Sequence, residues 1–247
     1  MIRLFRAEIG KLKGTLAALM VLLGPLAVIA FIWLLAMAKN FTNMESLGWN
    51  GLLQFGTVTW AYLVFPLLVA LQAAALCNIE HRTDGWKRLF ALPVRVPEVF
   101  LVKLAILFAL MAAATLVLAA GFLGSSWLIS MLVPGLPPLE ASLVGWMFGK
   151  AFACLAGGAL MIVLHFALSW TLDSFVFPIA VGVIAVMSVV QVGSSEYWVW
   201  HPWTWGMMAT ASSEPGRAVH AMLLAAGLAV LAIALLAPAA RRLRGQS

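Results

Sequence analysis

The stretch TLAALMVLLGPLAVIAFIWLLAMA, residues 15–38, decides the fold class of this chain. It contains no charged residue, and a helix of this length crosses the roughly 30 Å hydrocarbon core of a bilayer at about 1.5 Å of rise per residue. Basic residues before it are typical of a secretory signal, but the run exceeds the roughly 7–15 apolar residues of such a signal. We therefore predict a retained membrane anchor.

The rest of the chain has the same character. Hydrophobic residues make up 64% of the 247 residues and charged residues only 10%, whereas soluble domains are about half apolar and a quarter charged. We predict a single all-α polytopic membrane domain over residues 1–247, because no polar block is long enough to fold alone. The expected elements are an amphipathic segment at 1–14 and six transmembrane helices at 15–38, 56–78, 99–131, 144–172, 174–193 and 217–237.

The positions of the basic residues predict the orientation of these spans. If both termini are cytoplasmic, twelve of the fifteen Lys and Arg residues fall on the cytoplasmic side, and only Lys39, Lys150 and Arg217 fall on the other. Such a bias is typical of the cytoplasmic loops of membrane proteins. The net charge of +6 lies in short loops and termini, where it contacts lipid headgroups, and it does not indicate nucleic-acid binding.

The connection between the second and third spans, residues 78–99, reads NIEHRTDGWKRLFALPVRVPEV. Thr83 or Asp84 can cap a short helix there, and Pro93 ends it. Three apolar side chains at helical spacing share one face, namely Trp86, Leu89 and Phe90. We expect an amphipathic helix on the cytoplasmic surface, which is either a solvated loop element or a docking surface for a soluble partner.

The order of motifs around this connection resembles that of ABC-2 type transporter permeases, closest to the lantibiotic-immunity and bacitracin-resistance permeases. The motifs are Glu80, Trp86-Lys87, Leu89, Leu92-Pro93-Val94 and Lys103. The N-terminal Arg6-Ala7-Glu8-Ile9-x-Lys11-Leu12 resembles the amphipathic first helix of that family, and His201-Pro202-Trp203 resembles its outer loop. The chain departs from the pattern at Thr83-Asp84-Gly85, where related permeases often carry Gly-Thr or Asn-Thr before the Trp.

This resemblance implies the permease subunit of an ATP-driven exporter in the bacterial cytoplasmic membrane. Such permeases pair with a second copy or a homologous chain, and a separate ATPase dimer binds beneath them. ATP-Mg would bind that ATPase and no cofactor would bind this chain, which has no G-x-x-x-x-G-K-[ST] motif. The substrates suggested are peptide antibiotics or other amphiphiles; substrate and direction stay open. The implied ATPase-coupling residues are Glu80, Asp84, Trp86, Lys87, Leu89 and Phe90, with Arg6, Glu8 and Lys11 in the N-terminal helix. Glu80 would pair with a basic residue at the membrane base.

Several polar or aromatic residues in or near the spans have two interpretations each. Lys150 either extends to the headgroups or lines a translocation path. His165 is either a packing residue or a ligand or proton relay. Trp200 and Trp203 belong either to an interfacial aromatic belt or to a substrate-contacting or re-entrant element, as part of a translocation path or outer gate. We also expect Asp173 to cap the fifth span and Gln72 to bond across helices.

The competing classes are a polytopic membrane enzyme and a membrane scaffold without transport activity. The sequence has no H-E-x-x-H, no G-x-S-x-G and no grouped Asp residues. We therefore predict no catalytic residues and no metal site. Cys77 and Cys154 lie in apolar runs and are expected to be buried structural thiols.

Overall fold

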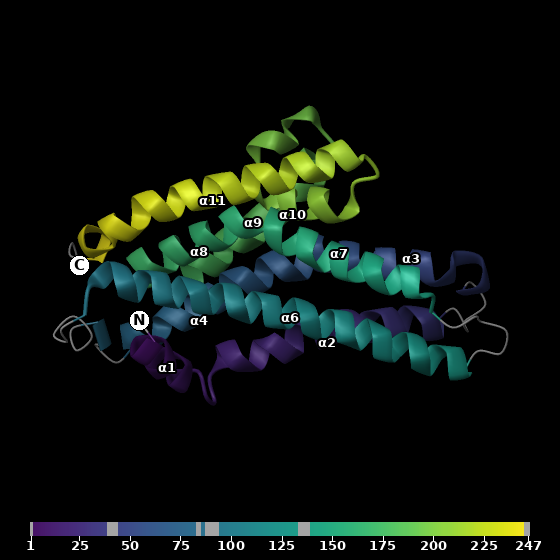
Figure 1. Cartoon of the computed structure of the whole chain (residues 1–247), viewed down its shortest axis with the longest axis horizontal. Helices are drawn as coiled ribbons and strands as arrows, with labels where there is room; N and C mark the ends of the chain where they lie inside the picture. Colours follow the sequence, from purple (N-terminus) through teal and green to yellow (C-terminus); the bar gives the residue numbers. More distant parts are fainter. Residues whose placement is uncertain (1, 39–43, 83–84, 87–93, 133–138, 245–247) are drawn as a thin grey trace.

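The computed structural model describes residues 2–38, 44–82, 85–86, 94–132 and 139–244, and within these ranges all regular secondary structure is helical (Figure 1). The elements in chain order are α1 (Ile2–Lys11), α2 (Leu16–Ala38), α3 (Met44–Thr59), the π turn η1 (Trp60–Val64), α4 (Phe65–Arg82), α6 (Val96–Leu132), α7 (Ala141–Gly157), α8 (Ala159–Thr171), α9 (Val176–Gly193), the 3₁₀ turn η2 (Glu196–Trp200), α10 (Pro202–Ala211) and α11 (Pro215–Arg244).

Five stretches of the described chain are helical, long and apolar enough to cross a membrane, and the bent pair α7–α8 adds a sixth. The prediction of an all-α polytopic membrane protein is therefore confirmed. The third apolar run is one continuous helix, α6, that extends along the length of the bundle without a bend (Figure 1). Large apolar side chains on the outward faces of these helices remain exposed, as expected for surfaces solvated by lipid.

The second span is longer than predicted, because helical structure continues from Trp49 to Arg82 through η1. Pro66 explains the π turn: it lacks an N–H, so the carbonyl of Tyr62 has no i+4 donor in the helix. The turn before it widens, and the N–H of Phe65 donates to the carbonyl of Trp60, five residues back.

The fourth span, predicted as one helix over 144–172, is broken between α7 and α8 by a bend of 45°. Two adjacent glycines allow other parts of the protein to approach this point. A Cβ on Gly157 would lie 2.6 Å from the carbonyl oxygen of Trp205, and one on Gly158 would lie 2.4 Å from the ring of Phe65. Helix α10 therefore packs directly against the bend, inside the bundle.

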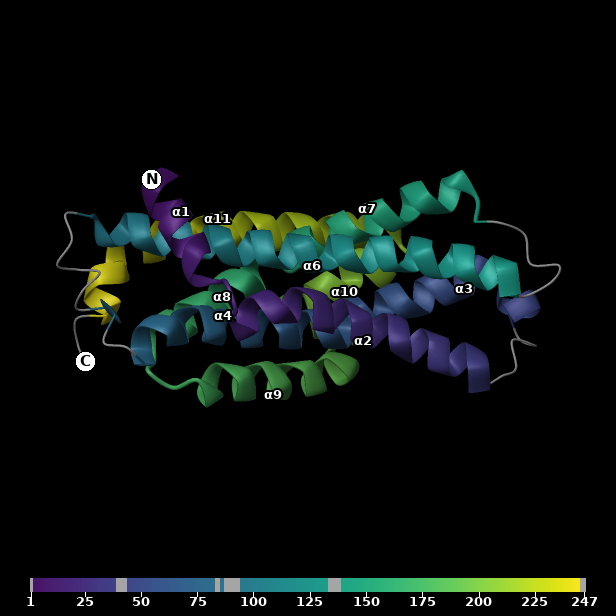
Figure 2. The same cartoon turned by 90° about the horizontal axis from the view of Figure 1, so that it is seen from below.

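Both termini lie at one end of the bundle, together with the C-terminal end of α4 and the N-terminal end of α6 (Figure 1). We call this the basic end. Helix α1 packs there against α6, and α9 lies on the outer side of α4 and α8 (Figure 2). The basic side chains that the structure describes at this end are Arg3, Arg6, Lys11, Lys13, Arg82, Arg95, Lys103, Arg241 and Arg242.

Two smaller predictions are wrong. The cap at the start of α9 comes from Ser174, whose hydroxyl accepts from the N–H of Phe177 at 3.2 Å, whereas the carboxylate of Asp173 lies 2.6 Å from His81. The carboxamide of Gln72 is buried and has no hydrogen-bond partner among the described residues. The two cysteines are buried, as predicted.

Candidate functional site

Helix α1 attaches to the basic end through one face. Leu4 and Phe5 are half-buried, and Glu8 and Leu12 are buried, at positions that share a face of a helix. Arg6 lies on the exposed side. Glu8 is therefore an acidic side chain on the buried face, and it requires a partner inside the protein.

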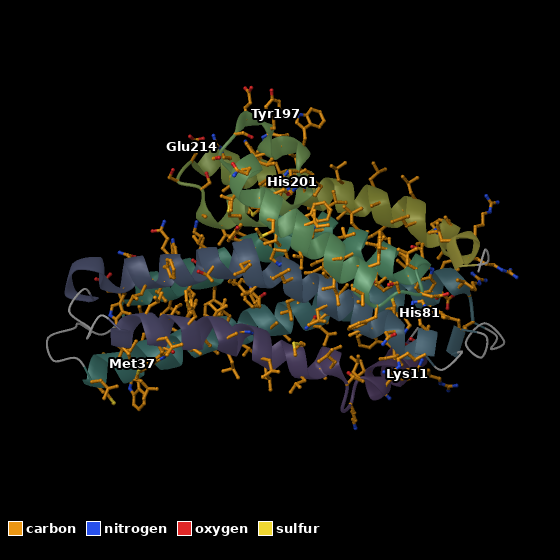
Figure 3. All side chains as sticks on the ribbon, turned by 180° about the vertical axis from the view of Figure 1, so that it is seen from behind. Lys11, Met37, His81, Tyr197, His201 and Glu214 are labelled. Atoms are coloured by element: carbon orange, nitrogen blue, oxygen red, sulfur yellow. The ribbon has the colours of Figure 1, made fainter. Side chains whose placement is uncertain are left out.

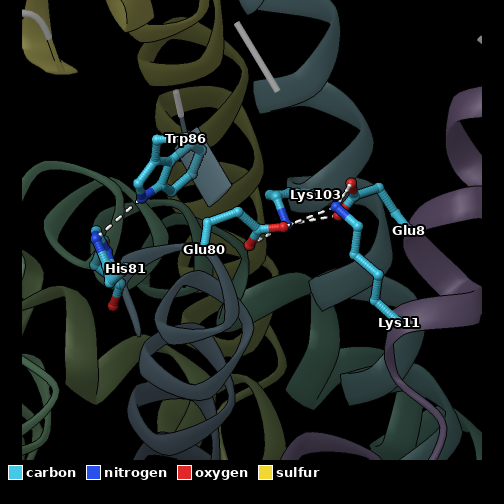
Figure 4. Close-up of polar contacts among 7 residues, drawn as sticks. Glu8, Lys11, Glu80, His81, Trp86 and Lys103 are labelled. Atoms are coloured by element: carbon cyan, nitrogen blue, oxygen red, sulfur yellow. Dashed lines mark hydrogen bonds and ion pairs between the residues drawn. The ribbon is translucent and has the colours of Figure 1, made fainter. Parts of the chain in front are cut away.

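Glu8 finds this partner in a closed arrangement of four charges from three helices, which we call the charge ring (Figure 4). Its members are Glu8 and Lys11 of α1, Glu80 of α4 and Lys103 of α6. The Lys103 ammonium lies 2.5 Å from Glu8 Oε2 and 2.9 Å from Glu80 Oε2. The Lys11 ammonium lies 2.5 Å from Glu8 Oε1 and 2.8 Å from Glu80 Oε1. Each carboxylate therefore contacts both ammonium groups, and the ring has no net charge.

Burial makes the ring a strong structural constraint. Lys103 is fully buried, and Glu8 and Glu80 are each 2% exposed, while the side chain of Lys11 is 36% exposed. A buried charge without a partner costs several kcal/mol, so all members must stay in place together. The ring thus fixes α1 to α4 and α6.

The two α1 members show the electrostatic effect of this pairing. Burial alone would raise the pKa of Glu8, but Lys103 and Lys11 outweigh it and hold this pKa below its ordinary value. For Lys11, burial acts to lower the pKa, but the two carboxylates outweigh it and raise this pKa. Both shifts favour the charged forms, so Glu8 and Lys11 are ionised at neutral pH.

Trp86 lies in the connection between α4 and α6 and contacts the charge ring on one side and Trp170 of α8 on the other. Its indole is 6% exposed and packs edge-on against Trp170 with ring centroids 4.6 Å apart. The Lys103 ammonium lies 5.9 Å from the centroid of the Trp86 ring, within the range of a cation–π contact. Trp170 in turn donates its indole N–H to the carbonyl of Ala240 in α11 at 3.1 Å.

His81 joins the same cluster on the opposite side of Trp86. Its Nε2 lies 3.0 Å from the carbonyl oxygen of Ser169, and its Nδ1 lies 3.0 Å from the Trp86 indole nitrogen and 2.6 Å from Asp173. Nδ1 accepts from Trp86 when it carries no proton and donates to Asp173 when it is protonated. The contacts of Trp86 and Asp173 with His81 therefore compete for one nitrogen atom.

Comparison with known proteins identifies the family to which the chain belongs. The sequence model of a family described as "ABC-2 family transporter protein" matches residues 4–189, from α1 into α9. The chain belongs to the ABC-2 transporter family. No curated protein and no solved structure gives a significant match. The family match includes every member of the charge ring and ends before the segment around His201 and α11.

The predicted coupling residues of this ABC-2 protein fall into two groups. Asp84, Lys87, Leu89 and Phe90 lie outside the described residues. Glu80 and Trp86 are described, and both are buried. The expectation of a basic partner for Glu80 is confirmed, since Lys103 and Lys11 both contact it. Trp86 directs its indole into the bundle, so its side chain does not present a docking surface.

The four residues predicted for a translocation path or outer gate of the ABC-2 protein do not form one group. His165 and Trp203 contact each other, because the Trp203 indole N–H donates to His165 Nε2 at 3.1 Å. The Lys150 ammonium lies 5.6 Å from the centroid of the Trp146 ring, and Trp200 is 83% exposed. Figure 3 shows Tyr197 and Glu214 of this region displaced along the bundle from Lys11 and His81.

The sequence analysis named Lys103 as a motif residue without assigning it to the site, and it missed His81 and Asp173 as members of the site. Lys103 carried a signal, because it is a cation inside an apolar run that predicts a membrane helix. No sequence pattern indicated His81 or Asp173, since their contact depends on how α4 packs against the α8–α9 connection.

Proposed function

We propose that this chain is the permease subunit of an ATP-driven exporter, with its basic end in the cytoplasm and a separate ATPase dimer bound there. The family membership supports a transporter component, and the absence of a nucleotide-binding motif in the sequence requires another source of energy. The concentration of Lys and Arg at the basic end supports the cytoplasmic orientation. In this proposal the membrane is the bacterial cytoplasmic membrane, and a second permease completes the assembly.

The charge ring is the single observation that carries the coupling mechanism. An ATPase that closes against α1 and the 83–93 connection pushes on elements that are tied to the transmembrane helices. Glu8 shares both of its cationic partners with Glu80, so a displacement of α1 is transmitted to α4 and, through Lys103, to α6. Such rigid-body transmission is a common basis of alternating conformations. The expelled substrates in this proposal are peptide antibiotics or other amphiphiles, as in the lantibiotic-immunity and bacitracin-resistance branch.

The test is co-purification with the ATPase encoded next to this permease. We expect Lys87→Glu in the 83–93 connection to abolish co-purification, because it reverses a charge on the proposed contact. Arg217→Glu is the matched control, since Arg217 lies at the start of α11, at the opposite end of that helix from the basic end. Equal retention of the ATPase by both variants, with normal membrane levels, would contradict the proposed docking site.

A further inference from the structure

A cleft of about 910 Å³ opens at the basic end where α2, α4 and the start of α9 meet. The described residues that line it are Thr15, Leu16, Ala75, Asn78, Ile79, Arg82 and Phe175. Its volume is within the range of sites that hold molecules of several hundred daltons. Helix α4 packs against both α2 and α9 and contributes four of these residues, so it forms the floor of the cleft.

The polar groups of the cleft include two that have no partner in the described part of the chain. Arg82 is exposed, and no described carboxylate lies within ion-pair distance of its guanidinium. The carboxamide of Asn78, one turn earlier on α4, is half-buried and makes no hydrogen bond to a described residue. Neighbouring acids are occupied: Glu80 contacts Lys11 and Lys103, and Asp173 contacts His81. Among the described residues, Arg82 of the cleft therefore has no counter-charge and the Asn78 amide has no hydrogen-bond partner.

The cleft also changes from polar to apolar along its depth. Thr15 immediately precedes α2, and Arg82 is the last residue of α4, so these side chains mark the boundary of the spans. On α4, Asn78 lies one turn deeper than Arg82, and Ala75 lies two turns deeper. Leu16 and Phe175 supply apolar walls. A ligand that fits must carry an anionic group at the membrane surface and an apolar chain toward the bilayer.

We propose that this cleft binds the head group of an anionic phospholipid of the cytoplasmic leaflet. The phosphate contacts Arg82, its ester or glycerol oxygens accept from the Asn78 amide, and an acyl chain lies along Leu16 and Phe175. A guanidinium is well suited to a phosphate because its N–H groups donate in parallel. The leaflet rests on the orientation proposed above, but binding itself does not require the ATPase or transport.

The test titrates the purified full-length chain in detergent with dioleoyl-phosphatidylglycerol and dioleoyl-phosphatidylcholine, and counts bound lipids by native mass spectrometry. We expect the wild type to prefer phosphatidylglycerol and Arg82→Gln to lower this preference by about tenfold, since a charge-assisted contact of this kind contributes roughly that factor. Arg82→Lys should retain most of it. Arg241→Gln, an exposed Arg at the same end, is the matched control and should behave as the wild type.

Three results would overturn the proposal. The first is an equal preference in Arg82→Gln and Arg241→Gln. The second is displacement of the lipid by glycerol 1-phosphate at equimolar concentration, which would assign the site to a soluble phosphate ester. The third is efficient disulfide formation between two Phe175→Cys chains in membranes, which would show that a second permease covers the cleft; Cys77 and Cys154 are buried and do not interfere. None of these results bears on the ATPase contact, so the two proposals fail separately.

Discussion

Replacement of Lys103 by methionine removes the charge at the centre of the basic end while keeping a side chain of similar length. The Lys103 ammonium is fully buried and contacts Glu8 at 2.5 Å and Glu80 at 2.9 Å. Without it, two buried carboxylates share Lys11, which is partly exposed. Removal of one partner from a buried ion pair costs about 3–5 kcal/mol.

The assay is thermal unfolding of the detergent-solubilised protein, followed by tryptophan fluorescence. For a chain of this length roughly 2–4 °C of Tm corresponds to 1 kcal/mol, so Lys103→Met should lower the Tm by roughly 6–20 °C. Arg241→Met is the control, because Arg241 is an exposed cation at the same end, and its Tm should change by no more than about 2 °C.

A double variant decides whether the loss reflects the ring or only the packing around Lys103. Glu8→Gln with Lys103→Met restores neutrality, so it should be less destabilised than the sum of the two single variants by about 1–3 kcal/mol. Additive losses would refute the idea that Glu8 and Lys103 stabilise each other.

Three further predictions follow from other contacts. The protection of α1 amides against hydrogen exchange, relative to the intrinsic rate at each pH, should stay constant between about pH 5 and 10. Glu8 has a pKa below its ordinary 4.5, so its contribution to the stability of α1 is lost only as the pH falls through that lowered value. Lys11 has a pKa above its ordinary 10.5, so its contribution to the stability of α1 is present below pH 10.5 and is lost as the pH rises past the raised pKa. Release of α1 at pH 6 would contradict both expectations. Gly157→Ala should lower the Tm by several degrees, because its Cβ would lie 2.6 Å from the carbonyl oxygen of Trp205. A cysteine at Lys87 should react with a membrane-impermeant maleimide in inverted vesicles and not in intact cells, and the reverse pattern would invert the proposed orientation.

The membrane spans could be predicted from the sequence because apolar length is a local property. Residues 15–38 gave a helix that begins at Leu16. The bend at Gly157 and Gly158 could not be predicted, since the hydropathy of that run is uninterrupted and the break depends on contacts with Phe65 and Trp205.

The candidate site was only partly predictable for a similar reason. Glu80 was identified from a motif, and its need for a basic partner follows from its position at a membrane boundary. Its actual partners, Lys11 and Lys103, lie 69 and 23 residues away in the sequence, and no local pattern indicates that α1 folds back to them. Glu8 shares a helix face with Leu4, Phe5 and Leu12, and this pattern indicates that Glu8 is buried, which composition alone does not reveal.

Helix α10 packs against α7 and α8 where the fourth span bends. Trp205 lies so close to Gly157 that a Cβ there would be 2.6 Å from its carbonyl oxygen. The same short helix carries Trp203, whose indole N–H donates to His165 of α8. A change in the angle between α7 and α8 would alter both contacts, so we expect the bend of the fourth span and the position of α10 to change together.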